Sequence, residues 1–120
     1  MQRFVAILGL ACLPWVAEAQ VPRVEIHPFE TRTPTDQQFL TGLADAPHAL
    51  IAGELRLPTA GTDRLPAVVL LHGSGGISPN VQAWVPELNG MGIATFVVDS
   101  FTGRGITSTV ADQDRLSRLA

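Results

Sequence analysis

The apolar residues of this chain form runs of two kinds. Residues 67–71 (Ala-Val-Val-Leu-Leu) and 93–98 (Ile-Ala-Thr-Phe-Val-Val) are almost continuously apolar, which is typical of strands covered on both faces, as in a parallel sheet. Residues 48–57 instead alternate, with apolar residues on one face and charged residues on the other. That period of two indicates an antiparallel strand with one face in water. The pattern therefore predicts two buried strands preceded by a half-exposed one.

The segments before these strands are more polar. Val24 and Ile26 alternate with polar residues, which predicts a short edge strand that Pro28 stops, because proline cannot donate a hydrogen bond to a neighbouring strand. Residues 31–36 are predicted to form a loop, and residues 58–64 a turn.

A helix is predicted between the two apolar runs. Ser78-Pro79 offers a start and Asn89-Gly90 with Gly92 an end, following the preference for proline in the first turn and glycine after the last. Pro86 removes a backbone hydrogen bond, so we expect either a kink there or a regular part that begins nearer Trp84. The apolar face comprises Val81, Trp84, Val85 and Leu88. The unit from 67 to 99 is long enough for a right-handed parallel crossover.

The last part of the chain predicts a loop and a second helix. Residues 102–107, which include Gly103-Arg104-Gly105, are expected to be a loop. Thr109 and Asp112 have the spacing of a capping box, and Leu116 and Leu119 begin an apolar helical face.

Composition narrows the class of protein. At 120 residues the chain is one domain at most, and its net charge of −3 excludes the strongly basic profile of nucleic-acid binding. The single cysteine, Cys12, lies in the leader described next, so the folded part has neither a disulfide nor a thiol nucleophile. No apolar run is long enough for a convincing membrane span. No Gly-Lys-Ser/Thr follows the glycines, which excludes a phosphate-binding P-loop. We predict no cofactor and no metal.

Residues 1–19 have the features of a secretory signal. Arg3 provides the positive start, residues 4–16 an apolar core, and Ala17-Glu18-Ala19 the small residues before a cleavage site. A buried N-terminal helix is the alternative. We therefore expect a secreted or periplasmic protein whose folded part is residues 20–120.

The candidate site follows the first apolar run, at His72-Gly73-Ser74-Gly75-Gly76. Glycine lets another group approach the main chain closely, and ligands of open α/β sheets bind at the carboxyl ends of strands. Together with the strand ending Val97-Val98-Asp99-Ser100-Phe101 and the following Gly103-Arg104-Gly105, this motif resembles the N-terminal part of the α/β-hydrolase fold. The resemblance is to the dienelactone hydrolase-like family and covers about residues 49–120.

The resemblance implies an α/β fold with a mostly parallel sheet flanked by helices. It also implies an exported hydrolase of esters or lactones that works by nucleophilic acyl transfer on a small-molecule substrate. In that family the nucleophile, the acid and the histidine follow the strand matching 93–98. No Gly-x-Ser-x-Gly elbow occurs here, and His27, His48 and His72 all precede that point. We therefore expect the three groups beyond Ala120 and the 120-residue chain alone to be inactive.

Two alternatives stay open, namely an inactive truncated fragment and a binding module of the same fold that holds a small acyl ligand. For single residues, the resemblance implies an oxyanion hole made by the backbone N–H of Ser74, with Gly73 second. A tight turn without chemistry is the alternative. His72 is expected to brace the loop, Asp99 to cap or brace the next one, and Arg104 either to contact an anionic substrate or to brace its own loop.

Overall fold

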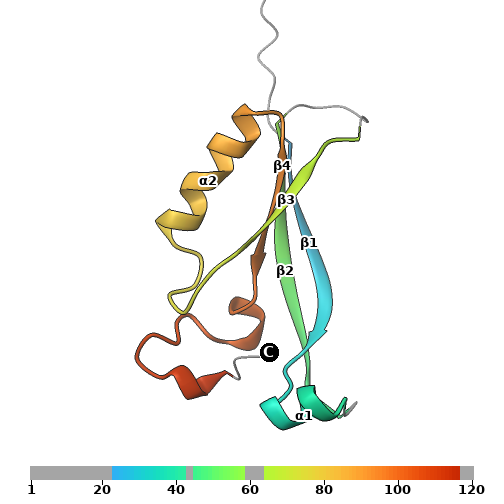
Figure 1. The fold of residues 1–120 in the computed structure, drawn as a ribbon, viewed down its shortest axis with the longest axis vertical. Helices are drawn as coiled ribbons and strands as arrows, with labels where there is room; N and C mark the ends of the chain where they lie inside the picture. The colour runs from blue at the N-terminus through green and yellow to red at the C-terminus, as the bar shows by residue number, and fades with distance from the viewer. Residues whose placement is uncertain (1–22, 43–44, 59–63, 117–120) are drawn as a thin grey trace, which may run out of the picture.

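The computed structural model describes residues 23–42, 45–58 and 64–116. The predicted signal and its cleavage site lie outside the described residues. The described chain forms a four-stranded sheet in the order β1-β2-β4-β3 with two α-helices (Figure 1). The elements are β1 (Arg23–Arg32), α1 (Asp36–Thr41), β2 (His48–Leu57), β3 (Ala67–Leu71), α2 (Pro79–Gly90), β4 (Ala94–Asp99) and the short 3₁₀ turns η1 (Thr102–Arg104) and η2 (Gln113–Arg115).

The sheet is mixed and mostly antiparallel, so the predicted mostly parallel α/β-hydrolase-type sheet is wrong. β1 pairs with β2 and β2 with β4 in antiparallel fashion, whereas only β3 and β4 run parallel. The described residues therefore form a small α+β domain. The prediction was based on the two apolar runs, which form the parallel pair, and it expected β1 to be only a few residues long. The antiparallel pairs therefore make up more of the sheet than predicted.

β1 is longer than predicted because Pro28 does not stop it. The strand pairs with β2 along its whole length, from Arg23 opposite Leu57 to Arg32 opposite His48. β1 is an edge strand, and an edge position tolerates proline because one side of the strand has no partner to receive an N–H. The predicted bounds of β2 and β3 and the parallel crossover between β3 and β4 are confirmed, and β4 is shifted by one residue.

β3 is not covered on both faces, contrary to the prediction. Val69 and Leu71 are 60% and 71% exposed, whereas Val68 and Leu70 on the opposite face are half-buried. The physical reason is that β3 is the other edge strand and α2 lies on one side of the sheet (Figure 1).

The α2 layer is where the core is deepest. Val85 of α2 and Thr95 and Val97 of β4 are the largest fully buried side chains. α2 begins at Pro79 and continues through Pro86, so the regular part does not begin near Trp84. Trp84 is 55% exposed and does not join the packed face. The helix ends where the N–H of Ile93 bonds to the Leu88 carbonyl, around Gly92 with φ of +78°.

The other face of the sheet carries an aromatic row. The ring of Phe96 on β4 lies over Gly53 on β2, where a β-carbon would overlap it. The ring centroid of Phe96 is 6.2 Å from that of Phe29 and 6.3 Å from that of His27, both on β1. Glycine is therefore required at position 53 for the Phe96 side chain to lie across β2 and approach β1.

The predicted loop at 31–36 is shorter than expected, covering residues 33–35, and the helix predicted after Thr109 is wrong for the described residues. Residues predicted as loop include the start of α1, where Thr35 and Gln38 form a capping box and Gly42 closes the helix at φ of +68°. The helix predicted after Thr109 is replaced, as far as residue 116, by the single turn η2. Thr109 is buried, and its N–H bonds to the carbonyl of Ser74 instead of opening a helix. None of the helices in the described ranges is long and apolar enough to cross a membrane.

Candidate functional site

The loops that follow β3 and β4 lie at the same end of the sheet because these two strands are parallel. We name residues 72–76 and 100–109 the carboxyl-end loops. Figure 1 shows both beyond the tips of their strands, on the side of the sheet where α2 lies. Open sheets with parallel strands bind ligands at this end, outside the carboxyl ends of the strands.

The glycine loop closes as a tight turn. The N–H of Gly76 donates to the Gly73 carbonyl at 3.0 Å, and the two residues form an isolated antiparallel bridge. Gly76 has φ of +76°, and a β-carbon there would lie 2.9 Å from the carbonyl oxygen of Thr107. Glycine is therefore needed at position 76 both for its backbone angle and for the close approach of the second loop.

Ser74 is anchored to the second loop through its carbonyl and hydroxyl groups. Its carbonyl accepts hydrogen bonds from the N–H of Thr109 at 2.8 Å and from Ser108 Oγ at 3.2 Å. Its hydroxyl donates to Gln113 Oε1 at 3.2 Å. No histidine of the described chain makes a hydrogen bond to that hydroxyl, so the geometry gives Ser74 Oγ no base.

The backbone N–H of Ser74 differs from these bonded groups. No acceptor for it, or for the N–H of Gly75, is found among the residues that the structure describes. The Gly73–Ser74 peptide is trans, so this N–H points opposite to the Gly73 carbonyl, which faces the interior of the turn. The direction of the Ser74 N–H therefore follows from that of the Gly73 carbonyl, and this N–H has no acceptor in the described chain, whereas the backbone hydrogen bond of Gly73 is made by its carbonyl.

His72 lies between the two loops. Its Nε2 is 3.2 Å from the backbone N of Ser100 and 3.0 Å from Ser100 Oγ, and its Nδ1 is 2.9 Å from the Gly73 carbonyl oxygen. A carbonyl accepts only, so Nδ1 carries the proton, and Nε2 accepts from Ser100. The ring also packs edge-on against Phe101, with centroids 4.4 Å apart. These contacts hold the ring of His72 between the two loops, and its bracing role stays a prediction.

Asp99 ends β4 and caps the turn that follows. Its Oδ1 accepts from the N–H groups of Phe101 and Thr102 at 3.0 and 2.9 Å, and its Oδ2 accepts from the Thr102 hydroxyl. Partial burial opposes ionisation, but these hydrogen bonds, with a smaller contribution from the nearby His72, outweigh it and lower the pKa of Asp99. Asp99 therefore braces the loop as a carboxylate.

Arg104 joins the second loop to the end of β1. Its Nε donates to Thr33 Oγ1 at 2.8 Å, its Nη1 to the Ser100 carbonyl at 2.6 Å, and its Nη2 to the Arg32 carbonyl at 2.9 Å. Burial lowers the pKa of Arg104 from its usual high value. These hydrogen bonds favour the loop-bracing alternative, and both that role and substrate contact by Arg104 stay predictions.

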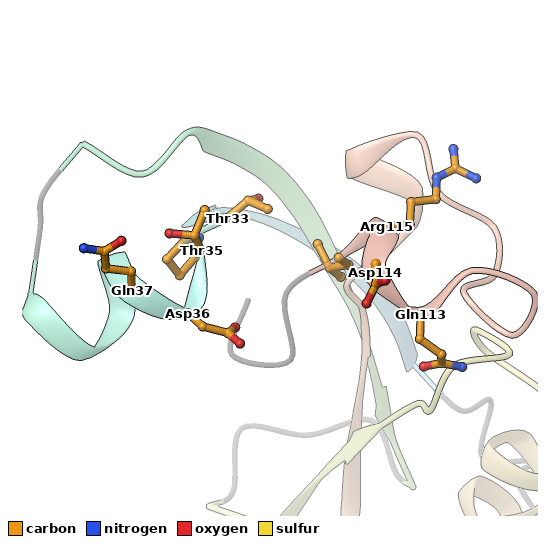
Figure 2. Close-up of a pocket in the computed structure, with 9 residues that line it drawn as sticks. Thr33, Thr35, Asp36, Gln37, Gln113, Asp114 and Arg115 are labelled. Atoms are coloured by element: carbon orange, nitrogen blue, oxygen red, sulfur yellow. The ribbon is translucent and has the colours of Figure 1, made fainter.

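A polar pocket lies between the start of α1 and the turn η2. Its volume is about 650 Å³, and Gln113, the partner of the Ser74 hydroxyl, belongs to its wall. Figure 2 shows its lining residues on two segments far apart in the sequence, the start of α1 and the turn η2. The lining residues are Thr33, Pro34, Thr35, Asp36, Gln37, Gln113, Asp114, Arg115 and Leu116.

Ser100 is the site residue that sequence reasoning missed. A serine after a strand is common, and no local pattern distinguishes it until the parallel pairing of β3 and β4 brings it to His72. Across the described ranges, no group of three His, Cys, Asp or Glu side chains is arranged to hold a metal. The arrangement offers a backbone donor for a negatively charged oxygen, and one hydroxyl–imidazole contact.

Comparison of the chain with models of known protein families finds no match, and neither does comparison with curated proteins.

Proposed function

We propose that this protein is an exported hydrolase of esters or lactones, similar to the dienelactone hydrolase-like family, in which the glycine loop provides an oxyanion donor. The observation that carries the proposal is the Ser74 N–H, which lies at the carboxyl end of a parallel strand without an acceptor in the described part of the chain. Negative charge gathers on the carbonyl oxygen during acyl transfer, and a donor already fixed in direction lowers that barrier.

The proposed chemistry divides the work between this loop and groups elsewhere in the sequence. A nucleophile attacks the ester carbonyl and forms an acyl-enzyme, which water then hydrolyses. We propose that the nucleophile, the acid and the catalytic histidine lie in sequence beyond Ala120. Ser74 is not the nucleophile in this proposal, because its hydroxyl donates to Gln113 and has no base beside it.

The test separates the backbone of Ser74 from its side chain. Ser74→Pro removes the N–H, and we expect kcat for p-nitrophenyl acetate to fall about a hundredfold, the usual cost of one oxyanion donor. Ser74→Ala keeps the N–H, and we expect near wild-type turnover. Both variants are made in the protein as its gene encodes it, including any sequence after Ala120, with thermal unfolding as the check on folding.

The 120-residue chain by itself is the negative control and should hydrolyse no activated ester above background. A coding sequence that stops at Ala120, or a longer protein without ester turnover, would refute the proposed function. A folded, fully active Ser74→Pro enzyme would place the donor elsewhere. Loss of activity in Ser74→Ala alone would mean that the hydroxyl, not the backbone, takes part.

A further inference from the structure

We propose that Ser100 is a positioning residue that directs the Ser74 N–H through His72. This inference rests on the proposed function and adds to it a residue that the glycine motif does not include. Ser100 approaches His72 with two donors, its backbone N–H at 3.2 Å and its hydroxyl at 3.0 Å, both aimed at Nε2. Ser100 is itself held through its carbonyl, which accepts from Arg104 Nη1 at 2.6 Å.

The two donors of Ser100 select one form of the imidazole. In a neutral histidine one ring nitrogen donates and the other accepts, and the partner of one nitrogen decides the state of the other. Two donors at Nε2 require a lone pair there, which leaves the proton on Nδ1. That proton is then directed to the Gly73 carbonyl oxygen, 2.9 Å away.

The Gly73 carbonyl and the Ser74 N–H belong to the same peptide group. Since this group is planar and trans, fixing the direction of the carbonyl also fixes the direction of the N–H. The second bond to the same carbonyl, from the N–H of Gly76 at 3.0 Å, acts from within the turn. Ser100 therefore influences the direction of the Ser74 N–H indirectly, through the ring of His72 and the Gly73 carbonyl.

Arg104 connects Ser100 to the end of β1, the edge strand on the other side of the sheet from β3. Its other two donors bind Thr33 Oγ1 and the Arg32 carbonyl at the end of β1. The position of Ser100 is thus set by both β4 and β1. Through its contact with His72, Ser100 in turn helps to position the glycine loop.

A nucleophile–base pair is the competing interpretation of the same contact. A serine hydroxyl 3.0 Å from an imidazole nitrogen is within the reach that such a pair needs. However, Nε2 also accepts the backbone N–H of Ser100, and Nδ1 binds a carbonyl rather than a carboxylate. The nearby Asp99 carboxylate is engaged by Phe101 and Thr102. These contacts favour positioning over nucleophilic attack.

The experiment compares Ser100→Ala with Ser100→Thr, which restores a hydroxyl. The readouts are the ring-nitrogen NMR shifts of His72, which report the tautomer and the hydrogen bonding of each nitrogen, and kcat and KM for p-nitrophenyl acetate in the protein as its gene encodes it. Ser100→Ala removes the hydroxyl donor at Nε2 but keeps the backbone N–H, so the Nδ1–H tautomer should persist while the Nε2 resonance shifts towards that of a less hydrogen-bonded nitrogen. We expect kcat to fall about tenfold, part of the cost of losing a donor outright, with little change in KM. Ser100→Thr should recover both the resonance and kcat. Ser78→Ala is the matched control, because Ser78 makes no side-chain cap bond to α2.

The outcomes separate this inference from the proposed function. An active Ser100→Ala enzyme with wild-type kcat, or with an unchanged Nε2 resonance of His72, would overturn the inference alone. A covalent acyl group trapped on Ser100 would overturn it in favour of the nucleophile. Absence of turnover in the wild-type protein would refute the proposed function and, with it, the catalytic part of this inference.

Discussion

Strand β4 joins two regions that differ in how they are held together. In the α2 layer, the buried Val85 packs against the sheet beside Val97 and Thr95, and the Thr95 hydroxyl is buried without a hydrogen-bond partner in the described chain. In the carboxyl-end loops, side chains such as Asp99, His72 and Arg104 hold the backbone by directed hydrogen bonds. One strand therefore connects a region dominated by apolar packing to a region dominated by polar bonds.

The difference indicates which perturbations each region tolerates. Apolar packing depends on volume and shape and is insensitive to the protonation of nearby groups. A polar loop depends on the direction and charge of each donor and acceptor, so the loss of one partner leaves a group unsatisfied. The proposed oxyanion donor lies in the polar region, where direction is controlled most closely.

The largest expected effect is at Gly103, where the second loop meets the sheet. A β-carbon at this position would overlap the carbonyl oxygen of Leu50 on β2, which is backbone and has little freedom to move. We expect Gly103→Ala to lower the free energy of unfolding by about 3 kcal/mol, the upper part of the range for overpacking. Urea denaturation measures it.

Gly75→Ala is the matched control for Gly103→Ala. Its β-carbon would meet nothing within 4 Å, and its φ is not positive. It should change stability by less than about 0.5 kcal/mol, as surface substitutions do. Equal losses in the two variants would contradict the close approach of η1 to β2.

A smaller loss is expected at Gly53, on the aromatic face of the sheet. Here the β-carbon of Gly53→Ala would overlap the ring of Phe96, a side chain that is able to shift. We expect a loss of about 1–2 kcal/mol in the same urea measurement. Because the cost comes from the ring, adding Phe96→Leu should remove much of the penalty. Strictly additive effects of the two substitutions would contradict this explanation.

The smallest effect, at Asp99, is the one that depends on pH. Since hydrogen bonds lower the pKa of Asp99 in the folded protein, its carboxylate stabilises the fold fully above the unfolded value of about 3.9. That stabilisation is lost as the pH falls through the lower, folded value. Asp99→Asn should therefore cost about 1 kcal/mol at neutral pH, where a charged acceptor is replaced by a neutral one, and progressively less below pH of about 4.

Thr95→Val is the control from the α2 layer for the measurement on Asp99. It replaces a buried hydroxyl that has no partner in the described chain, so stability should change little or rise, equally at every pH. The measurement is urea denaturation of both variants from neutral to acid pH. A cost at Asp99→Asn that does not diminish in acid would contradict a role for its charge.

The sequence alone predicted the elements whose signals are local. The bounds of β2 and β3 follow from the periodicity of the side chains, and α2 from its start at Pro79 and its end near Gly92. The glycine loop was also visible as a candidate site, because five consecutive small or polar residues after an apolar strand are unusual. In each case the deciding residues are neighbours along the chain.

Tertiary structure decided what depends on a distant partner. Whether β1 continues past Pro28, and whether Val69 and Leu71 are covered, depends on which strands lie at the edges of the sheet. Thr109 has the spacing of a helix cap, yet its N–H bonds to the Ser74 carbonyl, a partner 35 residues away in a different loop. Ser100 reaches His72 only because β3 and β4 run side by side. Local periodicity determines a strand, but the choice of neighbour sets its exposure, its ends and the contacts of the loops that follow.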